Sequence, residues 1–204
     1  MNQTIWWTRH VPAPQRNREI IGGGTDRPLD DSGLKLASVR AKQLAQAVRE
    51  GRLHLGSTVV ASPLLRARQT AEIFAEELGC TLVEYPELRA QHFGDLEAKT
   101  VDEIEASHLV RHLHSNVPPE RLYTDAAPGG EAIDEAVARV HRVRAELLNA
   151  YDYPLVVSHG SLLKALILTR NNVPPQRWNA IASQFKGMVI RDTSDGLHPQ
   201  RLFN

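Results

Sequence analysis

Short apolar runs alternate along the chain with longer stretches of helical periodicity, and this alternation limits the fold more than any other feature of the sequence. The runs that we predict to be strands are Thr4–Thr8, Thr58–Ala61, Thr81–Glu84, Pro154–Ser158 and Gln184–Arg191. Strands that alternate with helices favour an α/β protein built on a mostly parallel sheet. Helices on both faces of such a sheet give a three-layer α/β/α sandwich, which is the fold that we expect.

Capping residues mark the ends of the predicted helices. Asp30, Asp31 and Ser32 offer side-chain caps for a helix that continues to about Glu50, and Gly51 is its stop. The other predicted helices are Pro63–Glu77, which is followed by Gly79, then Glu131–Tyr151 and Ser161–Arg170.

Domain organisation is expected to be simple. The sequence has no 20–50-residue repeat, no low-complexity block and no long linker, so we expect one domain over residues 1–204. Residues 92–127 form the least regular region and contain Pro118 and Pro119. We predict that this region is a lid or an insertion.

The charge balance excludes some classes of partner. Lys and Arg number 24, Asp and Glu number 24, and the nine His count as neutral. A zero sum gives no support to nucleic-acid binding, which depends on neutralising phosphates, but it allows one small basic pocket. No apolar stretch is long enough for a membrane span, and the first residues lack the pattern of a signal peptide. We therefore expect a cytoplasmic protein that binds neither nucleic acid nor membrane.

The predicted strands end in residues suited to phosphate chemistry. Arg9 and His10 follow the first strand, Arg66 lies just after the second, and His159 and Gly160 follow the fourth. Ligands collect at the carboxyl ends of parallel strands, where arginine can grip phosphate oxygens and a helix start adds N–H donors. A histidine can attack phosphorus as a nucleophile. Taken singly, each of these residues is more often a cap or a surface residue.

Several segments in a fixed order carry a family resemblance. They are Thr8–His10, Gly23–Leu29, Ser62–Ala71, His92–Glu97, Pro128–Glu131 and Ser158–Gly160. In this order they resemble the histidine phosphatase superfamily, in the branch with phosphoglycerate mutases and cobalamin-pathway α-ribazole phosphatases. The resemblance implies a phosphoglycerate mutase-like fold.

The resemblance also implies a reaction. His10 would attack a phosphoryl group and become transiently phosphorylated, while Arg9, Arg66 and His159 surround the phosphoryl oxygens and Gly160 helps to bind them. The substrate would be a small phosphorylated metabolite, no metal or cofactor would be needed, and the assembly could be a homodimer. A single cysteine, Cys80, agrees with the absence of a cysteine cluster for zinc.

Two departures from the family pattern bear on this expectation. The usual Arg-His-Gly-Glu-Thr opening is replaced after His10 by Val11, Pro12, Ala13 and Pro14, and the prolines remove two N–H donors. We interpret this change as one of specificity. In addition, Ala90 stands where the family has the glutamate that acts as general acid, and an alanine cannot transfer a proton.

The missing acid leaves three functions open. The chain could be a phosphatase of reduced or altered activity, a phosphoglycerate mutase-type phosphotransferase, or a catalytically impaired protein that binds phosphorylated ligands. Glu87, His92 and Glu97 are nearby in sequence, and His92 is the first choice for a substitute acid. The simpler interpretation of His92 is that its side chain orients the loop.

Overall fold

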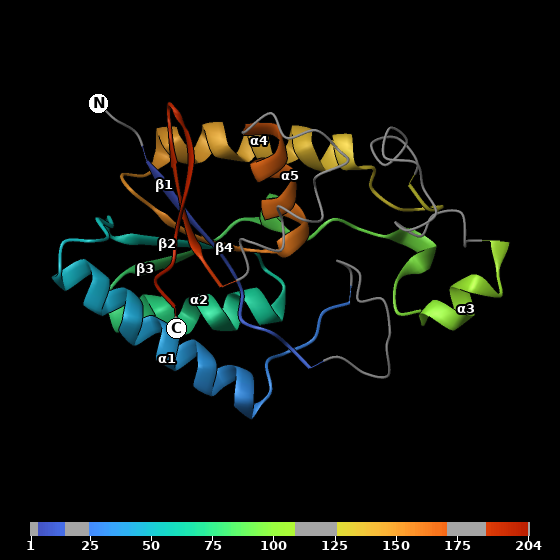
Figure 1. The fold of residues 1–204 in the computed structure, drawn as a ribbon, viewed down its shortest axis with the longest axis horizontal. Helices are drawn as coiled ribbons and strands as arrows, with labels where there is room; N and C mark the ends of the chain where they lie inside the picture. The colour runs from blue at the N-terminus through green and yellow to red at the C-terminus, as the bar shows by residue number, and fades with distance from the viewer. Residues whose placement is uncertain (1–3, 15–24, 109–125, 171–186, 204) are drawn as a thin grey trace.

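A six-stranded sheet crosses the protein, with the strand order β3-β2-β4-β1-β5-β6 (Figure 1). The structure is a computed structural model, and it describes residues 4–14, 25–108, 126–170 and 187–203. The strands are β1 Ile5–Arg9, β2 Thr58–Ala61, β3 Thr81–Glu84, β4 Leu155–Ser158, β5 Val189–Thr193 and β6 Gly196–Gln200. The first four strands are parallel to one another, while β5 and β6 run antiparallel to their neighbours. The prediction of a mostly parallel sheet is confirmed.

Helices cover both faces of the sheet. The helices of the described residues are α1 Asp31–Arg49, α2 Leu65–Leu78, α3 Val101–Glu105, α4 Ile133–Ala150 and α5 Gly160–Arg170, with 3-10 turns η1 Pro86–Leu88 and η2 Gly94–Leu96. Figure 1 shows α1 and α2 on one side of the sheet and α4 and α5 on the other. Neighbouring residues of a strand point to opposite faces, so Trp6 packs in the α1–α2 layer and Trp7 in the α4–α5 layer. The three-layer α/β/α sandwich is thus confirmed.

Local capping chemistry fixes several helix ends. The Asp30 carboxylate accepts the Gly33 N–H at 2.8 Å and begins α1, as predicted. Gly79 ends α2 with a φ of 66°, a left-handed conformation that glycine adopts without strain. Helix α2 begins at Leu65, two residues later than predicted, and the Asp26 carboxylate accepts the Leu65 N–H at 2.6 Å. A distant residue therefore caps this helix.

The last part of the sheet differs from the prediction. The expected strand Gln184–Arg191 is observed as β5 Val189–Thr193, while residues 184–186 lie outside the described residues. Strand β6 was not predicted because Pro199 lies within it. Since β6 is an edge strand, it can contain a proline, because one of its two sides pairs with no neighbouring strand.

The region predicted as a lid contains regular structure. Helix α3 was not predicted, although Thr100 and Glu103 form a capping box at its start. Figure 1 places α3 at one end of the molecule, apart from the sheet. Residues 109–125 lie outside the described residues, so the lid stays a prediction. Among the described helices, none combines the length and apolarity needed to cross a bilayer.

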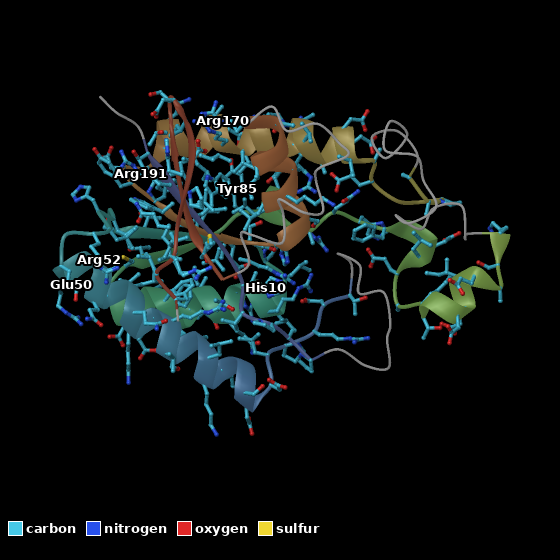
Figure 2. The ribbon with its side chains drawn as sticks, viewed as in Figure 1. His10, Glu50, Arg52, Tyr85, Arg170 and Arg191 are labelled. Atoms are coloured by element: carbon cyan, nitrogen blue, oxygen red, sulfur yellow. The ribbon has the colours of Figure 1, made fainter. Side chains whose placement is uncertain are left out.

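A buried ion cluster joins the α4–α5 layer to the sheet. Asp192 of β5 is 0% exposed, and its Oδ2 lies 2.6 Å from Arg144 Nε of α4. Arg170 of α5, labelled in Figure 2, is 3.6 Å from the other carboxylate oxygen. The Trp7 indole N–H donates to Asp192 at 3.2 Å. One carboxylate therefore ties two helices and two strands together.

Candidate functional site

Three strand ends meet at one edge of the sheet. The His10 N–H donates to the Ser158 carbonyl at 3.0 Å, and the Ser62 N–H donates to the Val157 carbonyl at 3.1 Å. These bonds extend the β1–β4 and β2–β4 pairings past the strands themselves. The ring centroids of His10 and His159 are consequently only 5.0 Å apart. Figure 2 labels His10 where β1 ends.

His10 has the protonation state of a nucleophile. Its Nδ1 lies 2.5 Å from the Val11 carbonyl oxygen, which can only accept, so Nδ1 carries the proton and Nε2 keeps its lone pair. The side chain is 6% exposed. Burial, followed by the charges of Arg9, Arg66 and Arg40, lowers the pKa of His10 to about 3. His10 is therefore neutral at neutral pH.

His159 is held from the side of β2. Its Nε2 lies 2.7 Å from Ser62 Oγ, and the residue is 2% exposed. Burial, then His10 and the nearby arginines, holds the pKa of His159 well below its usual value. Its Nδ1 is buried and has no hydrogen-bond partner in the described part of the chain.

The two predicted arginines reach the site from different elements. Arg66, near the start of α2, is buried and donates to the Thr25 carbonyl at 2.7 Å. The guanidinium of Arg9 runs beside Gly160, where an added Cβ would lie 3.4 Å from Arg9 Cζ. Glycine at the first residue of α5 therefore leaves room for this side chain. The fold brings the predicted site residues together, namely Arg9, His10, Arg66, His159 and Gly160. Their roles stay predictions.

Arg40 is a further cation that sequence reasoning missed. It lies on α1, its Cζ is 4.9 Å from the centre of the Phe203 ring, and its charge acts on both Arg9 and His10. None of the ion pairs found among residues 4–14, 25–108, 126–170 and 187–203 involves it. An arginine in an amphipathic helix looks like a solvated surface residue, so the sequence offered no signal.

The backbone around Ala90 is firmly held beside His159. The Ser158 hydroxyl donates to the Leu88 carbonyl at 3.0 Å, and the Ser161 hydroxyl accepts the Gln91 N–H at 3.1 Å. Both serines lie within two residues of His159 in the chain. Ala90, the position that the sequence resemblance assigns to the acid glutamate, therefore lies between two residues that are bonded to the chain on either side of His159.

Arg139 of α4 holds the same segment from another direction. Its Nε and Nη2 groups bind the two carboxylate oxygens of Glu131 at 2.8 and 2.6 Å. Its Nη1 donates to the Glu87 and Arg89 carbonyls. Four of the five guanidinium donors are therefore used to hold backbone and the Glu131 carboxylate.

The three residues that the sequence offered as substitute acids have different surroundings. Glu87 is exposed. His92 is also exposed, with its Nδ1 2.9 Å from the Gly129 carbonyl and 3.1 Å from the Gly94 nitrogen, as a loop-orienting side chain would be. Glu97 is partly buried, accepts the Phe93 N–H at 2.9 Å, and its charge acts on Arg66. Of the three, Glu97 is the one whose charge bears on the predicted phosphate-binding arginines.

Comparisons with known proteins agree with the sequence resemblance. The family model described as "Histidine phosphatase superfamily (branch 1)" matches residues 5–197. The "Probable phosphoglycerate mutase GpmB" of Photorhabdus laumondii subsp. laumondii is 30% identical over 177 residues, covering 83% of this chain and 75% of that protein. The protein of the same name from Klebsiella pneumoniae subsp. pneumoniae is 32% identical over 175 residues, with the same coverage.

Solved structures show the same fold at lower sequence identity. A mycobacterial glucosyl-3-phosphoglycerate phosphatase superposes with a TM-score of 0.73 at 23% identity, covering 94% of this chain and 90% of its own. The α-ribazole phosphatase from Shigella flexneri gives a TM-score of 0.73 at 20% identity, covering 97% and 94%. The phosphoglycerate mutase-like fold is therefore confirmed.

Proposed function

Because this chain belongs to the histidine phosphatase superfamily, we propose that it hydrolyses a small phosphomonoester through a phosphohistidine formed on His10. The observation that carries the proposal is the meeting of two buried, neutral histidines, 5.0 Å apart, with the charges of Arg9 and Arg66 acting on both. Phosphoryl transfer to a histidine requires a neutral nucleophile and fixed positive charges around the phosphoryl group, because its catalysis depends mostly on positioning and electrostatic stabilisation.

The reaction has two steps. The lone pair of His10 Nε2 forms a bond to phosphorus while the bond from phosphorus to the ester oxygen breaks, and that oxygen leaves with the bonding pair and takes up a proton. Water then attacks the phosphohistidine, which releases inorganic phosphate, returns the lone pair to Nε2 and gives up one proton. Arg9, Arg66 and His159 would stabilise the charge on the phosphoryl oxygens in both steps.

A panel of phosphomonoesters tests the proposal. We expect turnover by the wild type, loss of turnover in His10→Ala, and radiolabelled phosphate that is trapped on the wild type but not on His10→Ala after acid-free quenching. His141→Ala is the matched control, because His141 bonds to Thr169 between α4 and α5 and lies outside the histidine pair. Activity that survives in His10→Ala would rule out the phosphohistidine.

A phosphoglycerate mutase-type phosphotransferase is the second candidate, favoured by the names of the relatives that are 30% and 32% identical. A mutase returns the phosphoryl group to a second hydroxyl rather than to water. Assays that follow both inorganic phosphate and the interconversion of 2- and 3-phosphoglycerate separate the two candidates. Release of phosphate without interconversion supports the phosphatase.

Ala90 favours a third candidate, an impaired enzyme that mainly binds phosphorylated ligands. General acid catalysis contributes about 10²–10⁴ in rate, and it matters least when the leaving group is already a good one. We therefore expect p-nitrophenyl phosphate to be cleaved much faster than alkyl phosphates. Restoring the acid in Ala90→Glu should raise alkyl phosphate turnover far more than that of p-nitrophenyl phosphate. Equal, fast turnover of both esters by the wild type would contradict the loss of the acid.

Glu97 and His92 are compared in the same assay. If Glu97 replaces the absent acid, Glu97→Gln lowers alkyl phosphate turnover while leaving p-nitrophenyl phosphate turnover nearly unchanged. His92→Gln serves as the parallel variant, because His92 lies in the same loop but is exposed. The reverse pattern would assign the acid to His92.

A further inference from the structure

Ser62 occupies a place that the proposed reaction does not use. It follows β2, is 0% exposed, and its hydroxyl lies 2.7 Å from Nε2 of the His159 ring. A fully buried hydroxyl must find partners for both its lone pair and its proton, because an unpaired buried polar group is destabilising. Its partners therefore reveal where its proton lies.

The hydrogen bonds of Ser62 decide the direction of the bond to His159. Within the described part of the chain, Ser62 Oγ has two polar partners, the Leu64 N–H at 3.3 Å and His159 Nε2 at 2.7 Å. The Leu64 N–H can only donate, so Ser62 accepts from it. The hydroxyl proton then has one acceptor in reach, the lone pair of His159 Nε2.

The protonation of His159 follows from this direction. Burial and the surrounding positive charges keep the pKa of His159 far below neutrality, so the ring is neutral and carries a single proton. Because Nε2 accepts from Ser62, that proton lies on Nδ1. The Nδ1 atom is buried and has no partner among the residues that the structure describes. A donor is thus left without an acceptor on a ring whose centroid lies 5.0 Å from that of His10.

We infer that Ser62 is a positioning residue that fixes the Nδ1–H tautomer of His159, so that this N–H donates to an oxygen of the phosphoryl group held between the two histidines. The inference rests on the proposed function. With the other tautomer, a nitrogen lone pair would face the negatively charged oxygens, and the interaction would change from attraction to repulsion. Ser62 itself touches neither substrate nor reacting atoms.

The tautomer can be observed directly by nitrogen-15 NMR of histidine-labelled protein, in which protonated and unprotonated ring nitrogens resonate far apart. His159→Gln identifies the signals of His159. We expect Nδ1 to be the protonated nitrogen in the wild type, and the Nδ1–H proton to shift downfield when inorganic phosphate is added. A wild-type spectrum with the proton on Nε2 overturns the inference, whatever the activity.

Variants test whether Ser62 is the cause. In Ser62→Ala the proton should move to Nε2, and kcat/KM should fall about 100- to 1,000-fold, in line with the loss of one preorganised donor. Ser62→Thr keeps the hydroxyl and should keep the Nδ1–H tautomer. Ser158→Ala is the control, because it removes the neighbouring buried hydroxyl that bonds to Leu88 and not to the ring.

The outcomes separate this inference from the proposed function. An unchanged Nδ1–H tautomer in Ser62→Ala overturns the inference, as does a tautomer change in Ser158→Ala of the same size. If the expected tautomers are found but no phosphomonoester is cleaved, the proton assignment is supported and the phosphatase proposal fails.

Discussion

Acidification should unfold this protein partly through a single buried histidine. The pKa of His10 is lowered to about 3 by burial and by nearby arginines, whereas a histidine in an unfolded chain has a pKa of about 6.5. Between these values the unfolded chain binds a proton at His10 that the folded protein does not bind. The free energy of unfolding therefore has its full value, as far as His10 is concerned, above about pH 6.5. This stability is lost progressively as the pH falls toward 3.

The size of the effect follows from the two pKa values. Proton uptake at His10 in the unfolded chain lowers the free energy of unfolding at about pH 4.5 by about 2.7 kcal/mol, compared with its value at neutral pH. His159 contributes in the same direction, because its pKa is also lowered. A loss of this size is a large share of the total stability of an ordinary domain, about 5–15 kcal/mol.

Urea denaturation of the wild type and of His10→Asn measures this contribution. Asn cannot take up a proton, and its amide can still donate to the Val11 carbonyl. At about pH 7.5 the two proteins differ only by lost contacts, because His10 is neutral in both states. At about pH 4.5 we expect the difference in unfolding free energy to have moved by about 2.7 kcal/mol in favour of His10→Asn.

The refuting result is a constant difference. If the free energies of unfolding of wild type and His10→Asn fall in parallel across this pH range, His10 titrates near its ordinary pKa in the folded protein. The description of His10 as a buried, permanently neutral nucleophile would then be wrong.

Three other substitutions have definite expected outcomes. Asp192→Asn removes the carboxylate of a buried ion cluster and should lower the free energy of unfolding by about 3–5 kcal/mol, measured by urea denaturation. Arg40→Gln removes a cation that acts on His10 and should raise the pKa of His10, which an NMR titration would show. Gly94→Ala places an added Cβ 2.2 Å from the Pro128 carbonyl oxygen, at a residue whose φ is 55°. We expect it to lower the free energy of unfolding by about 1–3 kcal/mol in the same urea assay. An unchanged denaturation midpoint would contradict the described loop contact.

The sequence predicted those parts of the fold that local chemistry determines. Asp30 caps α1 through a residue three positions away, and Gly79 ends α2 by its own conformation, so both signals lie within one helical turn. The start of α2 was misplaced because its cap, Asp26, is 39 residues distant. Strand β6 was missed because Pro199 argues against a strand unless the strand is known to be at an edge, which only the assembled sheet reveals.

Some features of the candidate site could likewise be predicted from the sequence, and others could not. Arg9, His10, Arg66 and His159 could be proposed because parallel strands bring their carboxyl ends to a common edge. Arg40 could not, since its nearness to His10 depends on how α1 packs against the sheet. The proton positions on the histidine rings were also beyond the sequence, because they depend on which atoms lie opposite each nitrogen.

The hydrogen bonds that hold the segment around Ala90 also bear on which side chains position 90 can carry. Arg139 grips the Glu87 and Arg89 carbonyls, and the serines beside His159 bind the backbone of Leu88 and Gln91. None of these bonds uses the side chain of residue 90. These hydrogen bonds therefore hold the segment without setting which side chain position 90 must carry.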